Sequence, residues 1–287
     1  MSREEAVSSI YGYLRPSKKF PNVWCSGCGI GIVMGSLIRA VDKIGLDKDD
    51  VAVVSGIGCS GRMPVYLDFN TMHTTHGRAL AFATGLKLAQ PRLKVIVVMG
   101  DGDALAIGGN HFIHSARRNI DLTAIVINNS IYGMTGGQYS PTTPMDKRAT
   151  TAPYGNIEPP FPVCELAIAA GASYVARSTV YHVVEMDRQI EQAIRKNGFS
   201  LVEAVSYCHT AYGRLNKFGK AVDNMRLLKE TSVSKTAAEK LTPEEQEGKI
   251  IRGVLVDQDK PEYCEMYDQV IARVQNKGNG ADGGSGE

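Results

Sequence analysis

The hydrophobic positions of the chain follow two alternating patterns. Continuous apolar runs rich in β-branched residues, typical of strands buried on both faces, lie at 51–55, 94–99, 123–128 and 201–205. Segments with apolar residues three and four positions apart, typical of amphipathic helices, lie at 29–44, 77–90, 104–119 and 183–197. Strands that alternate with helices imply a parallel sheet covered on both faces and joined by right-handed crossovers. The pattern therefore predicts a doubly wound, mostly parallel α/β fold.

Two stretches break this alternation. Residues 140–162 are rich in Pro and Thr and long for a connection, which favours a lid or a binding loop. From residue 218 the sequence becomes charged and weakly helical, and it ends in a Gly-rich run at 278–287. We therefore expect one main domain over 1–217 and a C-terminal arm with a flexible tail over 218–287.

The composition of the chain argues against nucleic acid and membrane as binding partners. The 32 basic and 30 acidic residues leave a net charge of +2, so no basic footprint indicates nucleic acid or an anionic membrane. The first residues contain no apolar run of signal-peptide length, and no later run approaches the roughly 18 residues that a membrane helix needs. We expect a cytoplasmic protein that acts on small molecules, with no nucleic acid and no membrane as partner.

Acidic and amide side chains are predicted to lie together at one edge of the sheet, at the carboxyl ends of two neighbouring strands. The sequence GDG at 100–102 turns the chain after one strand, and Asn128 and Asn129 end the next. Open parallel sheets bind ligands at this edge, and amides that begin a helix can hold phosphate oxygens. A carboxylate beside phosphate requires a cation, and oxygen ligands of this kind suit magnesium. A turn that merely ends a buried strand is the alternative for GDG taken alone.

The segment from GDG to the asparagine pair resembles the diphosphate-binding motif of thiamine-diphosphate enzymes. By that resemblance, Mg²⁺ is held by Asp101, by the side chain of Asn129 rather than of Asn128, and by the carbonyl of Ile131. The sequence YGMTGGQ at 132–138 continues the resemblance with small residues suited to wrapping a cofactor. The residues implied in cofactor binding are Ile57, Gly58, Cys59, Ser60, Gly100, Asp101, Gly102, Asp103, Asn129, Ile131, Gly133, Met134 and Thr135.

Four of the six cysteines fall at the same predicted edge. Cys25 and Cys28 form a C-x-x-C at the entrance to a helix, whereas Cys59 and Cys208 each follow a predicted strand. Four thiolates that meet there fit either a zinc site or an iron–sulfur cluster, and only the cluster carries electrons.

The thiamine motif combined with these cysteines resembles the β subunit of the 2-oxoacid:ferredoxin oxidoreductases. The segments that carry the resemblance are WCSGCGIG, GIGCSGR, HGRALAFATG, GDGDALAIGGNHFIHSARRN and NNSIYGMTGGQYSPTT, spread over nearly the whole chain. Ser26 departs from the proline that many relatives carry. The resemblance implies that Cys25, Cys28, Cys59 and Cys208 hold a 4Fe-4S cluster beside thiamine diphosphate and Mg²⁺. Thiamine would then take the electrons released as carbon dioxide leaves a 2-oxoacid, and the cluster would pass them singly to ferredoxin.

The same resemblance implies partners. Thiamine activation needs a glutamate on the pyrimidine ring, and no glutamate of this chain carries a signature for that role. In the resembled family, the pyrimidine-binding domain lies on a separate α subunit. We therefore expect a chain that is inactive alone and works with an α subunit, coenzyme A, a 2-oxoacid and ferredoxin, in a dimer of αβ dimers.

The 2-oxoacid is inferred from finer features. The short two-subunit form, GIGCSGR and the tail segment GVLVDQDKPEY look most like the members that act on 2-oxoglutarate. Pyruvate or a branched-chain 2-oxoacid is the alternative substrate. A thiamine enzyme with structural zinc and no electron transfer, and a non-catalytic nucleotide-binding module, are the alternatives from other classes.

Several further side chains are candidates for the site or for simple packing. His76 and Arg78 are expected to contact the diphosphate or the substrate carboxylate, and Arg62 to contact an acidic substrate. A structural histidine or a charge at a helix start is the alternative for His76 and Arg78, and a surface arginine is the alternative for Arg62. Cys164 and Cys264 are interpreted as packed thiols.

Overall fold

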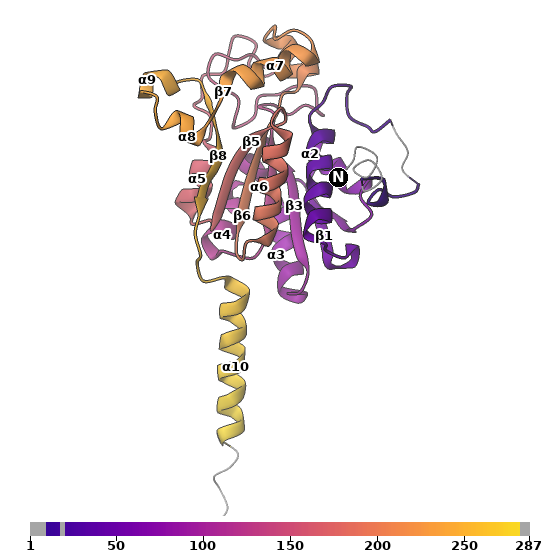
Figure 1. Ribbon diagram of the computed structural model, residues 1–287, viewed down its shortest axis with the longest axis vertical. Helices are drawn as coiled ribbons and strands as arrows, with labels where there is room; N and C mark the ends of the chain where they lie inside the picture. Colours follow the sequence, from indigo (N-terminus) through magenta and orange to yellow (C-terminus); the bar gives the residue numbers. More distant parts are fainter. Residues whose placement is uncertain (1–9, 18–20, 282–287) are drawn as a thin grey trace, which may run out of the picture.

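A sheet of eight strands forms the centre of the protein, in the order β2-β1-β3-β4-β6-β5-β8-β7 (Figure 1). The computed structural model describes residues 10–17 and 21–281. Neighbouring strands pair in parallel except β5 and β8, which are antiparallel. The predicted doubly wound, mostly parallel α/β fold is therefore confirmed. The strands are β1 (Val51–Ser55), β2 (Asn70–His73), β3 (Lys94–Gly100), β4 (Thr123–Asn128), β5 (Tyr174–Thr179), β6 (Ser200–Val205), β7 (Ser232–Ser234) and β8 (Ile250–Asp257).

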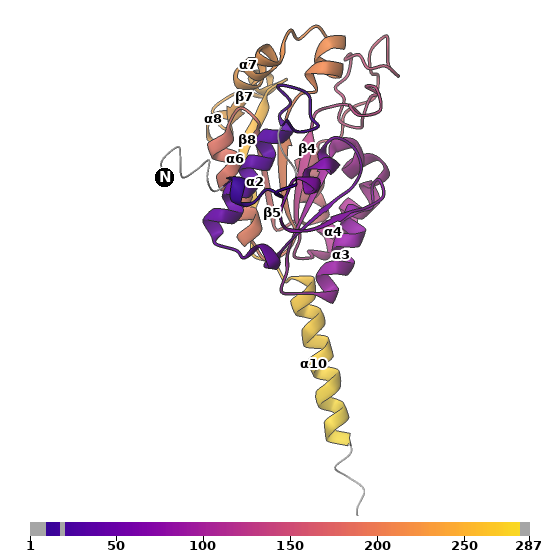
Figure 2. The ribbon, with the colours of Figure 1, turned by 90° about the vertical axis from the view of Figure 1, so that its right-hand side faces the viewer.

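Helices cover both faces of this sheet (Figure 2). On one face α2 (Ile30–Ile44) and α6 (Val183–Arg195) pack together, and on the other lie α3 (Ala79–Ala89), α4 (Gly109–Arg118) and α5 (Val163–Ala170). Successive residues of β1 and β3 alternate between the two apolar cores, as the period of two in a strand requires. Because both faces are buried, these central strands are apolar throughout, which is the pattern that made them visible in the sequence.

The turns that follow the strands are irregular at one edge of the sheet. The segment predicted as a single helix over 104–119 is divided into a π-helical turn, η3 (Asp103–Ile107), and α4. A second π-helical turn, η4 (His209–Gly213), begins directly after Cys208. Two 3₁₀ turns, η1 (Lys48–Asp50) and η2 (Ser60–Val65), flank β1. Single π-helical turns are frequent at functional sites, and both of these lie beyond the carboxyl ends of parallel strands.

The C-terminal segment is joined to the sheet. The region predicted as an arm over 218–287 contains α7 (Ala221–Thr231), α8 (Lys235–Ala238), α9 (Pro243–Gln246) and α10 (Tyr263–Ala281). Between them β8 pairs antiparallel with β5, so the sheet continues past the predicted boundary. The charged sequence around β8, with Arg252 and Asp257 inside the strand itself, hid its strand pattern. Of the predicted tail, residues 278–281 continue α10, which extends away from the sheet, and 282–287 lie outside the described residues (Figure 1).

In the part of the chain that the structure describes, no helix combines the length and the apolar composition that crossing a membrane would require.

Candidate functional site

A cavity of about 150 Å³ opens where β1, β3 and β4 end. These strands run parallel, so the loops that follow them meet at one edge of the sheet. All the residues that the sequence suggests for cofactor binding line this cavity: Ile57, Gly58, Cys59, Ser60, Gly100, Asp101, Gly102, Asp103, Asn129, Ile131, Gly133, Met134 and Thr135. His76 and Tyr132 complete the wall. The structure thus brings together residues from four separate segments of the chain.

Glycine residues, which have no side chain, form part of the cavity wall. Gly58 has φ +115°, a conformation that residues with a side chain rarely adopt. A Cβ atom on Gly102 would lie 2.2 Å from the ring of Tyr132, so only glycine fits there. A wall of this kind lets the backbone approach a ligand closely and leaves amide groups accessible to anionic oxygens.

Asp101 lies at the bottom of the site and is only 2% exposed. Its Oδ2 accepts hydrogen bonds from Ser140 Oγ at 2.5 Å and from Thr142 Oγ1 at 2.7 Å, and its Oδ1 accepts one from the backbone N–H of Asn129 at 3.3 Å. Burial raises the pKa of Asp101, and these donors oppose the rise only in part. A cation beside this carboxylate would stabilise its ionised form.

The side chain of Asn129 and two other oxygens meet next to that carboxylate. With its Nδ2 turned inward, the amide donates to Ile131 O at 2.8 Å and to Asp101 Oδ1 at 3.2 Å. Rotating the amide by half a turn would put its Oδ1 in the same place, so that a carboxylate, an amide and a carbonyl oxygen converge. Such an all-oxygen donor set fits Mg²⁺.

Asn128 faces a different environment. Its Nδ2 donates to Glu203 Oε1 at 2.8 Å, and the other oxygen of Glu203 accepts from Arg177 Nε at 2.6 Å. Glu203 is 3% exposed, so this ion pair is almost fully buried behind the cavity. The two consecutive asparagines therefore have separate partners, and only Asn129 turns toward Asp101.

A second, smaller cavity of about 90 Å³ adjoins the first. Its lining includes Cys25, Cys28, Cys59 and Cys208, the four cysteines that the sequence groups together. The two cavities have common wall residues, namely Cys59, Asn129, Gly133 and Met134. A Cβ atom on Gly133 would lie 3.3 Å from Cys208 Sγ and 3.9 Å from Cys59 Sγ, so the backbone of Gly133 separates the two spaces.

The thiols of Cys28 and Cys59 lie in an environment that disfavours their ionised form. Burial raises the pKa of Cys59 and raises that of Cys28 to about 11, and the neighbouring thiols add to the effect. Among residues 10–17 and 21–281, no three His, Cys, Asp or Glu side chains are gathered closely enough to hold a single metal ion.

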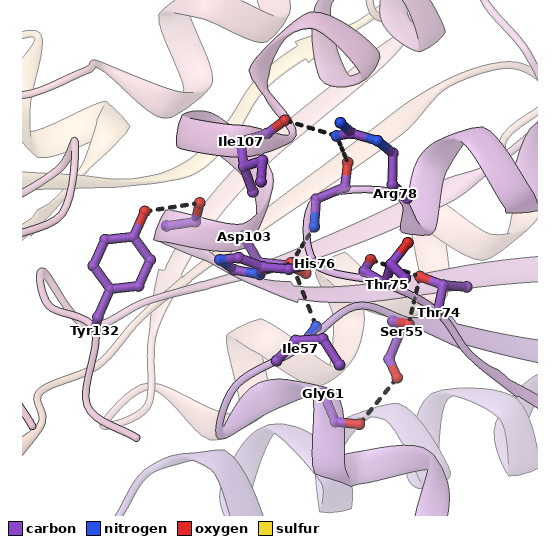
Figure 3. Close-up of polar contacts among 12 residues, drawn as sticks. Ser55, Ile57, Gly61, Thr74, Thr75, His76, Arg78, Asp103, Ile107 and Tyr132 are labelled. Atoms are coloured by element: carbon purple, nitrogen blue, oxygen red, sulfur yellow. Dashed lines mark hydrogen bonds and ion pairs between the residues drawn. The ribbon is translucent and has the colours of Figure 1, made fainter. Parts of the chain in front are cut away.

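Of the residues predicted to contact the substrate, only His76 lines the cavity (Figure 3). His76 lines the cavity, and its Nδ1 lies 2.5 Å from Asp103 Oδ1. Arg78 Nη1 instead donates to Ile107 O at 3.0 Å, at the end of η3, and Arg78 is not part of the cavity wall. Arg62 is exposed on η2 and is also absent from the wall. Contacts of these two arginines with a substrate stay predictions.

Sequence reasoning overlooked three residues of the site. Tyr132 stands in the cavity wall, and Ser140 and Thr142 donate to the buried carboxylate. The signal available was the hydroxyl-rich start of the loop at 140–162, which the sequence marked as a binding loop without assigning donors. The predicted packed thiols Cys164 and Cys264 are both buried.

Comparison with known proteins gives consistent matches. Residues 56–204 match the family described as "Thiamine pyrophosphate enzyme, C-terminal TPP binding domain". The chain is 51% identical over 265 residues to the 2-oxoglutarate synthase subunit KorB of Methanocaldococcus jannaschii, covering 92% of this chain and 98% of the relative. It is 53% identical over 268 residues to the subunit of the same name from Methanothermobacter thermautotrophicus, covering 93% of each. A solved 2-oxoglutarate:ferredoxin oxidoreductase from Magnetococcus marinus, with 2-oxoglutarate, coenzyme A and succinyl-CoA bound, superposes with a TM-score of 0.82 at 34% identity, over 93% of this chain and 91% of that one.

The cysteines of the metal-free chain should differ in reactivity. At pH 8 the exposed Cys25 should be alkylated first, and Cys28, with a pKa of about 11, should react on the order of 10² times more slowly because little of it is thiolate. The buried Cys164 should stay unmodified and serves as an internal control. Timed iodoacetamide labelling followed by peptide mass spectrometry measures all three rates. Equal rates for Cys25 and Cys28 would contradict the described environment.

Proposed function

The chain belongs to the family of β subunits of 2-oxoacid:ferredoxin oxidoreductases, and from this membership we propose that it supplies part of an active site for the oxidative decarboxylation of 2-oxoglutarate. In the proposed reaction, 2-oxoglutarate and coenzyme A give succinyl-CoA and carbon dioxide, and ferredoxin takes up the electrons one at a time. The same groups would serve the reverse carboxylation. The complex is proposed to work in the cytoplasm.

One observation carries the proposal, namely the shared wall between the two cavities. The larger cavity would hold the diphosphate of thiamine diphosphate, and the smaller would hold a 4Fe-4S cluster on Cys25, Cys28, Cys59 and Cys208. Cys59 and Gly133 belong to both walls, so the two groups would be neighbours. Bound thiamine diphosphate supplies an electron sink for the bond that breaks when carbon dioxide leaves. A one-electron carrier in the adjoining cavity would be close enough to receive those electrons.

Mg²⁺ would be held by Asp101 Oδ1, the Asn129 amide oxygen and the Ile131 carbonyl. Ser140 and Thr142 hold the second carboxylate oxygen, which fixes the orientation of the ligand. The cation would also offset the cost of burying this carboxylate and supply positive charge for the anionic oxygens of the diphosphate.

The remaining parts of the site would come from a partner. The KorB designation of the relatives implies an α subunit, and the proposed partner carries the pyrimidine-binding domain with its activating glutamate. We propose an assembly of two αβ units. The relatives named as 2-oxoglutarate synthase subunits, and the solved relative with 2-oxoglutarate bound, support 2-oxoglutarate as substrate ahead of pyruvate or a branched-chain 2-oxoacid.

The protein co-expressed with its α subunit and purified without oxygen should contain about four irons and four sulfides bound through this chain. Cys59→Ala should lose them together with the visible absorption, because it removes one of four thiolate ligands. Cys164→Ala, which alters a buried thiol outside the pocket, is the matched control and should keep the full complement. Iron and acid-labile sulfide analysis of the wild-type complex and of both variants measures the cluster content. Stoichiometric zinc without iron would instead favour a thiamine enzyme with a structural metal.

The complex should reduce ferredoxin faster with 2-oxoglutarate than with pyruvate in a steady-state assay. Arg62→Gln should lower kcat/KM for 2-oxoglutarate by about 10-fold or more, as expected for the loss of a charged hydrogen bond to a carboxylate, and should leave pyruvate turnover unchanged. Arg188→Gln, at an exposed arginine of α6, is the control. A greater rate with pyruvate would overturn the substrate assignment. An equal effect of Arg62→Gln on both substrates would remove Arg62 from substrate recognition.

Asp101→Asn should abolish the Mg²⁺-dependent binding of thiamine diphosphate to the complex. The substitution keeps the side chain's shape and removes the charge that holds the cation. Isothermal calorimetry with and without Mg²⁺ measures the affinity, and a melting curve verifies that the variant is folded. Asp50→Asn, at the opposite end of β1, is the control. Undiminished affinity of the Asp101 variant would refute the proposed cation site.

A further inference from the structure

His76 and Asp103 form a pair that the proposed cofactor contacts leave without a role. The two residues come from different segments, the loop before α3 and the start of η3. Their side chains meet at 2.5 Å between His76 Nδ1 and Asp103 Oδ1 (Figure 3). The Asp103 side chain is 2% exposed and that of His76 is 35% exposed, so the carboxyl group lies beneath the imidazole at the edge of the cavity.

The hydrogen bonds around Asp103 set the tautomer of His76 when the carboxyl group is ionised. Asp103 Oδ1 accepts from the backbone N–H of Gly77 at 2.7 Å and from that of Ile57 at 3.4 Å. An ionised carboxylate can only accept, so His76 Nδ1 is then the donor and the neutral imidazole carries its hydrogen on Nδ1. The other oxygen, Oδ2, is buried and has no partner within the described residues.

The second ring nitrogen of His76 is left available to a ligand. Within residues 10–17 and 21–281, no hydrogen bond is made by Nε2, and the side chain lines the larger cavity. The ring packs edge-on against Tyr132 with 6.1 Å between ring centres, and Tyr132 in turn donates to Gly102 O at 3.3 Å. These contacts hold the imidazole between a buried acceptor on one side and the cavity on the other.

The backbone around Asp103 leaves its carboxyl group little freedom. A Cβ atom on Gly56 would lie 2.0 Å from Asp103 Oδ2, and one on Gly108 would lie 2.3 Å from the carbonyl oxygen of Asp103. Gly77 holds the carboxyl group from the other side, because its backbone N–H donates to Asp103 Oδ1 at 2.7 Å. Close packing at Gly56 and this hydrogen bond from Gly77 make Asp103 a rigid support for His76.

We propose that His76 exchanges a proton with the carbonyl oxygen of the bound 2-oxoacid and that Asp103 is its positioning residue. This inference rests on the proposed function. As the carbonyl carbon gains a bond, its oxygen takes the proton from Nε2 of the protonated imidazole, and it returns that proton to Nε2 when the C=O bond forms again. The proton comes from solvent and no electrons move in this step, so no further reactant is needed. A fixed Nδ1–H keeps Nε2 directed at the reacting oxygen, which is the function of a carboxylate behind a catalytic histidine.

Two variants of the complex separate this role from cofactor binding. His76→Gln and Asp103→Asn should each lower kcat with 2-oxoglutarate by about 10²- to 10⁴-fold, the range for loss of a positioned acid–base group or of its correct tautomer. Calorimetric affinity for thiamine diphosphate with Mg²⁺ should be unchanged. His114→Gln, on α4 and outside the cavity wall, is the matched control and should keep full activity. Retention of the wild-type kcat by His76→Gln, or a loss of cofactor affinity that accounts for the fall in rate, would overturn the proposal.

The tautomer can be measured without any turnover. In the cofactor-free full chain labelled with ¹⁵N-histidine, the resonances missing from His76→Gln identify His76 among the six histidines. At high pH the wild-type spectrum should show hydrogen on Nδ1, and Asp103→Asn should shift it toward Nε2. Hydrogen on Nε2 in the wild type would overturn the proposal even if Asp103→Asn fails to fold. Failure of the proposed function would appear differently, as a wild-type complex that binds no thiamine diphosphate or holds no iron, with the tautomer unaffected.

Discussion

Parallel pairing of four neighbouring strands is the constraint on which the site depends. Because β1, β3, β4 and β6 point the same way, the residues that follow them emerge at one edge. Cys59 follows β1, Asp101 follows β3, Asn129 follows β4 and Cys208 follows β6. These residues are far apart in the sequence, and no local interaction brings them together. Their proximity is a property of the hydrogen-bonded register of the sheet, and that register is held by apolar residues packed on both faces.

A second constraint is the energy of burying Asp101. Burying an ionised carboxylate away from water costs free energy unless hydrogen bonds or a cation offset the lost hydration. The loop at 140–162 supplies part of the compensation, since Ser140 and Thr142 both donate to it. That loop has no helix or strand, yet Thr143 Oγ1 donates to Ser130 O at 2.7 Å and Asn156 Nδ2 donates to Thr143 O at 2.7 Å. Side-chain hydrogen bonds therefore hold the start of this loop against Asp101 and against the turn at Ser130.

The sequence was informative where chemistry and burial follow a short repeating pattern. The central strands could be recognised because both of their faces are buried, and the strand ends then predicted which residues would share an edge. The residues of GDG, the asparagine pair, Cys59 and Cys208 needed no more than this rule to be placed near one another, whereas Cys25 and Cys28 follow no predicted strand. Strands β2, β5, β7 and β8 escaped notice because none has the continuous apolar run of the other four. β2 and β7 are short and polar, β5 contains Arg177, and β8 lies in a charged stretch.

The sequence could not predict which side chains from distant segments contact each other. Arg177 lies within β5, and its buried partner Glu203 lies in β6, so a strand pattern gives no indication of an ion pair. Asp103 offers a similar case. Its cofactor contact stays a prediction, and the spacing gave no indication that its carboxyl group meets His76 and the backbone N–H of Gly77, which come from another loop. Spacing identifies which residues reach an edge, and only the packing decides which of them face each other.

The shared wall gives the proposed function a geometric basis. Cys59 and Gly133 each contribute to both cavities, and a Cβ atom on Gly133 would lie 3.3 Å from Cys208 Sγ. A side chain at this position would crowd that thiol and narrow the space between the two cavities. One-electron transfer from a two-electron donor favours contact between donor and acceptor, since the second electron must leave before the reduced intermediate reacts elsewhere. If the two cavities hold the two proposed cofactors, the backbone of the turn at Gly133 would set the separation between them.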